Sequence, residues 1–173
     1  ENVIVEGNVI HSLVSAPAGQ EWCFDDRSSC NVFSSGSDGS AIVIGSDGGP
    51  TNVTIIDNEI YDTVNAVRIE EGSLITITQN NFHDLSRQCL QLDKEGFDTI
   101  FTSNICRNAG RGIFQNWRVN FSLFVEDNLF ESVAGASIEY EANAVCSDST
   151  LVRNVFTDSG AVICGKSAAA TTE

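Results

Sequence analysis

Positive charge is scarce in this 173-residue sequence, which carries 9 Lys and Arg against 24 Asp and Glu, for a net charge of −15. Nucleic acids and anionic membranes both need a cationic surface, so neither is expected as a partner. No apolar run approaches the roughly 18 residues of a membrane-spanning helix, which predicts no membrane insertion. Methionine is absent and the sequence opens on Glu1, so we expect a segment of a longer secreted protein.

Metal-binding cysteine motifs are also missing. The six cysteines form no Cys-x-x-Cys pair and no cluster with histidine at zinc spacing, so no metal site is predicted. An even number of dispersed cysteines is typical of disulfides in an oxidising compartment. Two glycosylation sequons, at Asn52 and Asn120, favour the same secreted, extracellular location.

The cysteine pairing stays open at this stage, because six cysteines allow fifteen pairings. Short separations favour three sequential pairs: Cys23–Cys30, Cys89–Cys106 and Cys146–Cys164. The alternative is a buried free thiol at Cys106, which stands where other repeats have Phe or Ile.

What the sequence does contain is a repeat built on asparagine. Seven asparagines are each followed two residues later by an apolar residue, and the intervals run from 22 residues (Asn58 to Asn80) to 27 (Asn31 to Asn58). Repeats of this period predict a solenoid. The seven are Asn8, Asn31, Asn58, Asn80, Asn104, Asn128 and Asn154.

Strands, not helices, fit the residues around each asparagine. Apolar residues stand three and five positions before it, as Val53 and Ile55 do before Asn58. This alternation predicts a strand with one buried face. A second strand follows about ten residues later, as in 66–72 and 89–96. Like strands then stack about 4.8 Å apart, and the asparagine side chains form a hydrogen-bonded ladder at a corner.

The phrases ITITQNNFHDL (75–85) and QCLQLDKEG (88–96) resemble the repeats of right-handed parallel β-helix proteins, the pectate-lyase-like superfamily. The resemblance covers nearly the whole chain. It implies one all-β domain over residues 1–173, a right-handed parallel β-helix of about seven rungs with an asparagine ladder. It leaves the function open, because the superfamily includes lyases, hydrolases, epimerases, phage tailspikes and non-catalytic surface proteins.

In the family that the sequence resembles, polysaccharide chemistry takes place on the outer face of the second strand of each repeat. Five residues on this face are candidates for acid–base catalysis or for binding an acidic sugar, with Ca²⁺ if the substrate is acidic. They are Arg68, Glu70, Asp93, Glu139 and Glu141. Arg111 and Arg118 could add positive charge, and Trp117 could stack on a sugar ring.

The competing interpretation is that these residues form the solvent face of strands, with opposite charges laddered across rungs. The catalytic phrases of polygalacturonases, alginate epimerases and pectate lyases are missing from the sequence, which disfavours an enzyme. His11 and His83 share an outward column, but three rungs apart they are too distant to act together.

A short Gly-Ser-Asp-Gly repeat raises one cofactor question. It occurs at Gly36 and Gly45, a nine-residue spacing found in Ca²⁺-binding β-rolls. Only two copies exist and Ala41 stands where a second aspartate belongs, so turns around one strand explain the pattern equally well. No cofactor is predicted, with Ca²⁺ kept as the alternative.

The leading hypothesis for function is an extracellular, non-catalytic β-solenoid module, either a structural rod or an adhesion or glycan-interacting element of a surface or fibrous assembly. Its expected partners are further copies of itself or other extracellular proteins, and glycans. The alternative is a polysaccharide lyase or hydrolase.

Overall fold

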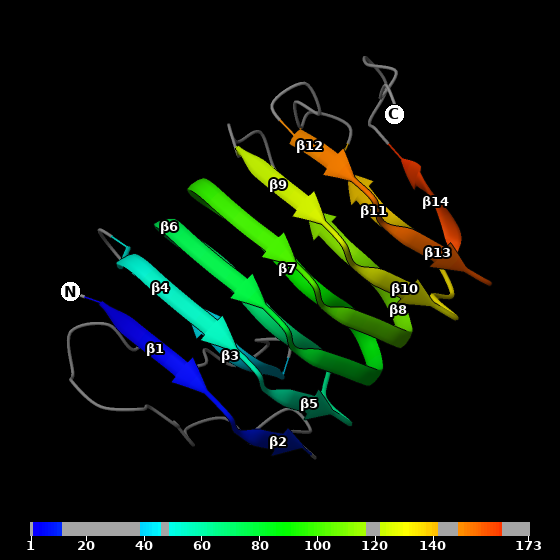
Figure 1. Cartoon of the computed structure of the whole chain (residues 1–173), viewed down its shortest axis with the longest axis horizontal. Helices are drawn as coiled ribbons and strands as arrows, with labels where there is room; N and C mark the ends of the chain where they lie inside the picture. Colours follow the sequence, from blue (N-terminus) through cyan, green and yellow to red (C-terminus); the bar gives the residue numbers. More distant parts are fainter. Residues whose placement is uncertain (1, 12–38, 46–48, 117–121, 142–148, 164–173) are drawn as a thin grey trace.

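The computed structural model describes residues 2–11, 39–45, 49–116, 122–141 and 149–163, which form strands and turns (Figure 1). None of these segments forms a helix able to span a membrane. The strands are β1 (Val3–Glu6), β2 (Val9–His11), β3 (Ser40–Ile44), β4 (Thr51–Ile56), β5 (Glu59–Tyr61), β6 (Asn65–Thr78), β7 (Asn81–Thr102), β8 (Ile105–Gln115), β9 (Leu123–Glu126), β10 (Leu129–Glu131), β11 (Ala136–Tyr140), β12 (Ser149–Val152), β13 (Val155–Thr157) and β14 (Gly160–Ile163).

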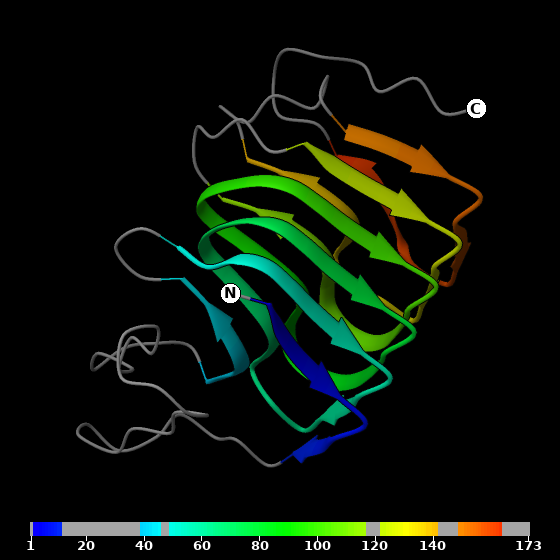
Figure 2. The same cartoon turned by 60° about the vertical axis from the view of Figure 1, so that its left-hand side comes forward.

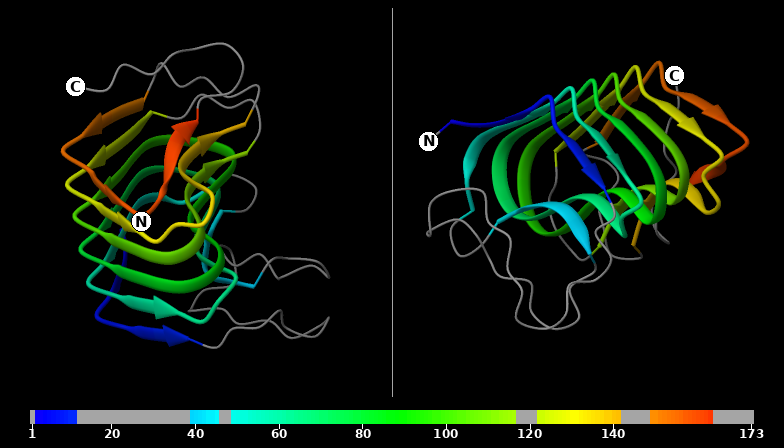
Figure 3. Two further views of the ribbon diagram at one scale, coloured as in Figure 1. Left: turned by 90° about the vertical axis from the view of Figure 1, so that its right-hand side faces the viewer. Right: turned by 90° about the horizontal axis from the view of Figure 1, so that it is seen from below.

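The strands pair in parallel and in register, so the chain winds into a solenoid whose turns stack on one another (Figures 2 and 3). On one face Val5 of β1 pairs with Ile55 of β4, and Ile55 pairs with Ile77 of β6. The long strands β6, β7 and β8 bend around a corner without interruption, so each contributes to two faces. The predicted parallel all-β solenoid is thereby confirmed.

The core lies inside the coil, where equivalent apolar residues of successive turns stack in columns. Alternation along each strand puts every second side chain inward, as predicted. In one column Ile60, Phe82, Cys106 and Phe130 are all fully buried. Phe101 packs between Phe82 and Phe130, with ring centroids 6.1 and 6.4 Å away.

The asparagine ladder occupies one corner of the coil. The backbone N–H and the Nδ2 of Asn80 donate to Oδ1 of Asn104, both at 3.0 Å. Asn104 repeats this pattern toward Asn128, at 2.8 and 3.2 Å. The ladder runs through Asn8, Asn58, Asn80, Asn104, Asn128 and Asn154.

Left-handed backbone on both sides of each asparagine makes the corner tight. The residue before the ladder asparagine has φ between 49° and 65° at all six described ladder positions, and the fourth residue after it has φ between 48° and 55° at five of them. Asp, Asn, Ser and Gly fill most of these positions because they tolerate this conformation. The residues are Gly7, Asp57, Gln79, Ser103, Asp127 and Arg153, and then Asp62, Asp84, Asn108, Ser132 and Asp158.

The predicted count of about seven rungs is not confirmed, because the solenoid has about four turns. Asn31 lies outside the described residues, and the ladder passes directly from Asn8 to Asn58: the Asn8 N–H donates to Asn58 Oδ1 at 3.0 Å. The expected spacing of three rungs between His11 and His83 is therefore wrong as well.

Candidate functional site

Parallel register brings the candidate residues onto one outer face, formed by the first part of β6, the middle of β7, the end of β8, and β11. Arg68 pairs with Gln91, Gln91 with Phe114, and Phe114 with Glu139. Glu70 and Asp93 stand two residues further along β6 and β7, and Glu141 directly follows β11. The alternation that fills the core therefore also gathers this polar surface.

Arg68 connects the first two turns of this face. Its Nε donates to Asp93 Oδ2, and its guanidinium lies 3.1 Å from Glu70 Oε1. Gln91 Nε2 donates to Asp93 Oδ1 at 2.6 Å, and Asn116 Nδ2 lies 3.4 Å from the same oxygen. The Asp93 side chain is only 7% exposed although it points out of the coil. Arg68, Glu70 and Asp93 thus form one compact cluster in which a single guanidinium binds two carboxylates.

Glu139 belongs to a separate pair. Its Oε2 accepts a hydrogen bond from Arg111 Nε at 2.5 Å, and the Arg111 guanidinium lies 4.7 Å from the ring centre of Phe114. Glu141 follows β11, at the end of this face. Trp117 and Arg118, the proposed sugar-stacking and carboxylate-binding residues, lie outside the described residues.

Beside this cluster, one polar atom has no hydrogen-bond partner in the described part of the chain. Gln91 is 6% exposed, and its Oε1 is buried without a partner within the described part of the chain. A buried acceptor left without a donor is unfavourable. A ligand hydroxyl or a water molecule would supply the missing donor.

A stack of rings, which the sequence prediction missed, lies on the outside of the asparagine corner. Tyr61 is sandwiched between His11 and His83, with ring centroids 4.9 Å apart on both sides and planes within 5° of parallel. The histidines are two ladder positions apart, so Tyr61 connects them. The signal was present in the sequence as residues three positions after each ladder asparagine, but the false position at Asn31 obscured it.

Two acidic side chains hold His83 in this stack. Its Nε2 lies 3.3 Å from Glu59 Oε1 and its Nδ1 lies 2.7 Å from Asp84 Oδ2. Asp84 also accepts a hydrogen bond from Asn108 Nδ2 at 3.1 Å. These bonds, first the one with His83, lower the pKa of the Asp84 carboxyl below its ordinary value.

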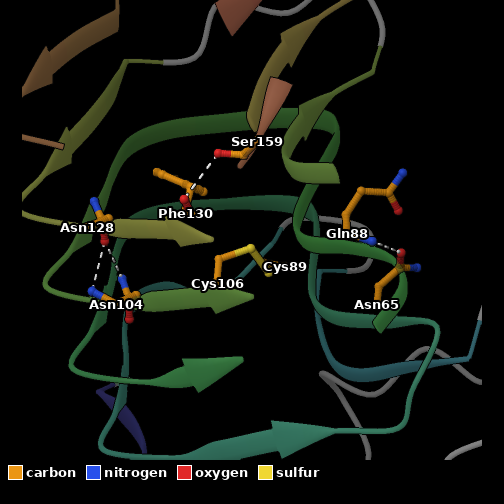
Figure 4. The surroundings of a disulfide bond; sticks show 8 residues. All are labelled: Asn65, Gln88, Cys89, Asn104, Cys106, Asn128, Phe130 and Ser159. Carbon is orange, nitrogen blue, oxygen red and sulfur yellow. Dashed lines mark hydrogen bonds between the residues drawn. A yellow bond between two sulfur atoms is a disulfide. The ribbon is translucent and has the colours of Figure 1, made fainter. Parts of the chain in front are cut away.

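A column of buried polar residues, also missed, precedes the candidate face along β6 and β7 and extends to β3. Asn65 Nδ2 donates to Ser40 Oγ at 3.1 Å. The Gln88 N–H donates to Asn65 Oδ1 at 3.3 Å (Figure 4). All three residues are at least 97% buried. These contacts position the strand beside the disulfide.

Of the three predicted disulfides, Cys89–Cys106 is present and links β7 to β8 inside the core (Figure 4). The alternative of a free Cys106 thiol is therefore wrong. The other two predicted pairs, Cys23–Cys30 and Cys146–Cys164, involve residues outside the described ranges. Within those ranges, no group of three His, Cys, Asp or Glu side chains could hold a metal ion.

Of the two glycosylation candidates, Asn52 lies within the described residues. Asn52 is the second residue of β4, has φ 63° and is exposed, and its Nδ2 donates to Asn2 Oδ1 at 2.6 Å. Asn120 lies outside the described residues, as does most of the Gly-Ser-Asp-Gly repeat, of which Gly39 and Gly45 are described.

Comparison with known proteins identifies the fold family. A family model described as the right handed beta helix region matches residues 24–172. Neither the curated proteins nor the solved structures contain a significant match to this chain.

Proposed function

Since this chain belongs to the family of the right-handed β-helix region, we propose that it is a non-catalytic structural module of an extracellular assembly. It acts as a stiff rod that holds or spaces its neighbours. In this proposal it forms a single domain within a longer secreted protein.

One observation carries the proposal: the charged residues of the candidate face are engaged with one another. Arg68 binds Glu70 in its own turn and Asp93 in the next, and Arg111 connects to Glu139 across turns. Acid–base catalysis needs carboxyl groups that reach the substrate. Carboxylates bound to arginines of neighbouring turns instead brace the stack, as opposite charges on adjacent strands do.

Two further features support an extracellular place of action. The Cys89–Cys106 disulfide is typical of an oxidising compartment. The exposed side chain of Asn52, within the sequon Asn52-Val53-Thr54, suits attachment of a glycan. Mass spectrometry of protein secreted from eukaryotic cells, before and after glycosidase treatment, would test this part of the proposal. An unmodified Asn52 in every molecule would contradict it.

A specific observation favours the alternative, a polysaccharide lyase or hydrolase. The buried Oε1 of Gln91 lacks a donor within the described residues, and Arg68 and Asp93 lie beside it. A sugar hydroxyl would donate to Gln91 Oε1, and an arginine beside it suits a uronate carboxylate. On this alternative the cluster binds substrate, with Ca²⁺ as an added ligand for an acidic polymer.

Incubation with neutral and acidic polysaccharides, with and without Ca²⁺, separates the two functions. The readouts are new reducing ends and unsaturated uronate products. The structural proposal predicts no turnover by the wild-type protein. Turnover that is lost in Asp93→Asn and Glu139→Gln but kept in Glu131→Gln would overturn it. Glu131 is the matched control because it lies on β10, away from the candidate face.

A further inference from the structure

His83 has a carboxylate beside each of its two ring nitrogens. Nδ1 lies 2.7 Å from Asp84 Oδ2, and Nε2 lies 3.3 Å from Glu59 Oε1 on the preceding turn. A neutral imidazole carries a proton on one nitrogen and a lone pair on the other. The contact with Asp84 has the length of an ordinary hydrogen bond, so the proton lies on Nδ1. The lone pair of Nε2 then faces the Glu59 carboxylate, and a cation between the two stabilises both.

The spacing of these two donor atoms fits a metal ion better than a proton. Charge-assisted hydrogen bonds between nitrogen and a carboxylate are about 2.7–2.9 Å long, and the distance from His83 Nε2 to Glu59 Oε1 exceeds this range. Zinc binds histidine nitrogen and carboxylate oxygen at about 2.0–2.2 Å with tetrahedral geometry, which puts two ligand atoms about 3.3–3.4 Å apart. The separation of Nε2 and Oε1 therefore equals one edge of a zinc tetrahedron.

Asn81 is placed to supply a third ligand. Its Nδ2 lies 3.4 Å from Glu59 Oε1, and its Oδ1 is buried without a hydrogen-bond partner among the described residues. The two ends of an amide are nearly equal in size, so the side chain can turn over and present Oδ1 to the ion. This rotation breaks no hydrogen bond that Oδ1 accepts from the described part of the chain. Solvent reaches the site because the Glu59 side chain is 45% exposed, so water completes the coordination.

The groups around His83 hold the ring in place for such a contact. Asp84 is not a ligand, because it lies at the other ring nitrogen, and its bond to Nδ1 fixes the tautomer as carboxylates do for zinc-bound histidines. Tyr61 packs on the ring from the preceding turn, with centroids 4.9 Å apart. Arg107 pairs with His83 from the next turn and opposes a cation, whereas the net charge of −15 favours one. The site has two charged ligands, fewer than a closed structural zinc site.

We propose that His83 Nε2, Glu59 and Asn81 bind a divalent transition-metal ion of the zinc class on the outer face of β5 and β7. Imidazole and carboxylate are ligands that zinc accepts. The ion connects two neighbouring turns of the coil, because Glu59 lies on β5 and His83 on β7. An ion that binds the folded state and not the unfolded state stabilises the fold. This inference holds for a structural module and for an enzyme alike.

The test measures zinc binding by isothermal titration calorimetry at neutral pH, together with thermal unfolding with and without zinc. Wild-type protein binds zinc and unfolds at a higher temperature in its presence. His83→Gln abolishes both effects, and Glu59→Gln and Asp84→Asn each weaken binding about tenfold or more. The matched control is His11→Gln, which removes a ring from the same stack and leaves Glu59 and His83 in place. It binds zinc as the wild type does.

Competition between zinc and protons supplies a second readout. A proton on Nε2 occupies the lone pair, so the zinc affinity of the wild type falls as the pH is lowered from neutral. Wild-type protein that binds no zinc, or that binds it equally at every pH, would overturn the inference. Undiminished binding in His83→Gln would overturn it too, as would an equal loss in His11→Gln. Circular dichroism shows that each variant is folded, and the exposed Glu59→Gln keeps the test decisive if His83→Gln does not fold.

Discussion

Replacing Asn104 by alanine tests how much the ladder contributes to stability. Asn104 is 1% exposed. Its Oδ1 accepts from the N–H and Nδ2 of Asn80, and its Nδ2 donates to Ile77 O and Asn128 Oδ1. In Asn104→Ala the Asn80 N–H loses its acceptor, which costs about 1–3 kcal/mol for a buried donor. The other lost bonds add about 1 kcal/mol or less each, so we expect a loss of about 4 kcal/mol.

Asn8→Ala is the matched control, because the same residue type stands at the exposed end of the same ladder. Asn8→Ala removes only the hydrogen bonds that Asn8 Nδ2 donates, and Asn58 Oδ1 keeps its bond from the backbone N–H of residue 8. Water replaces the remaining partners, so we expect a loss of about 0.5 kcal/mol. Urea unfolding followed by circular dichroism gives both free energies. Equal losses at the two positions would refute the reasoning, because the larger loss expected at Asn104 is attributed to its burial and not to the residue type.

Four further predictions concern stability and are checked by unfolding measurements. Replacing Cys89 and Cys106 together by alanine lowers the unfolding free energy by about 3 kcal/mol, since the disulfide closes a loop of 17 residues; an unfolding free energy equal to that of the wild type would contradict this. Gly112→Ala puts its Cβ 2.2 Å from a carbonyl oxygen of the next turn, so it lowers stability by about 2 kcal/mol or more; an unchanged midpoint would contradict this. Leu74→Asn raises stability by about 1 kcal/mol, because Leu74 is exposed and has φ 54°; a lower melting temperature would be the opposite result. The lowered pKa of Asp84 means that its hydrogen bonds stabilise the fold above its ordinary value of 3.8 and that this stabilisation is lost as pH falls further; Asp84→Asn should weaken the acid dependence of the urea midpoint.

The inward columns of the core could be predicted because the alternation of apolar and polar residues within each strand identifies its inward and outward faces. The alternation around Asn58 and Asn80 identifies the buried side without any knowledge of the neighbouring turn. The order in which strands stack cannot be predicted in this way, because it depends on residues far apart in the sequence. Asn31, followed by Phe33, has the same local pattern as the true ladder positions, so pattern counting placed it in the ladder.

The candidate face shows the same division between local and non-local information. Alternation predicted that Arg68, Asp93 and Glu139 point outward on one face. It could not predict that Arg68 would bind Asp93 while Glu139 would bind Arg111, because those pairs depend on register between turns and on side-chain rotamers. The His11–Tyr61–His83 stack was missed for a related reason, since one wrong ladder position separated rings that lie in contact.

The ladder also keeps the same hydrogen bonds when the number of residues between two successive asparagines changes. Successive ladder asparagines are 22 to 26 residues apart from Asn58 onward, yet Asn8 and Asn58 are 50 residues apart and make the same bonds. Closing a loop of twice the length costs only about 0.6 kcal/mol. Register between neighbouring turns is therefore set by the paired strands and the ladder contacts, and not by the number of residues that separate two ladder positions.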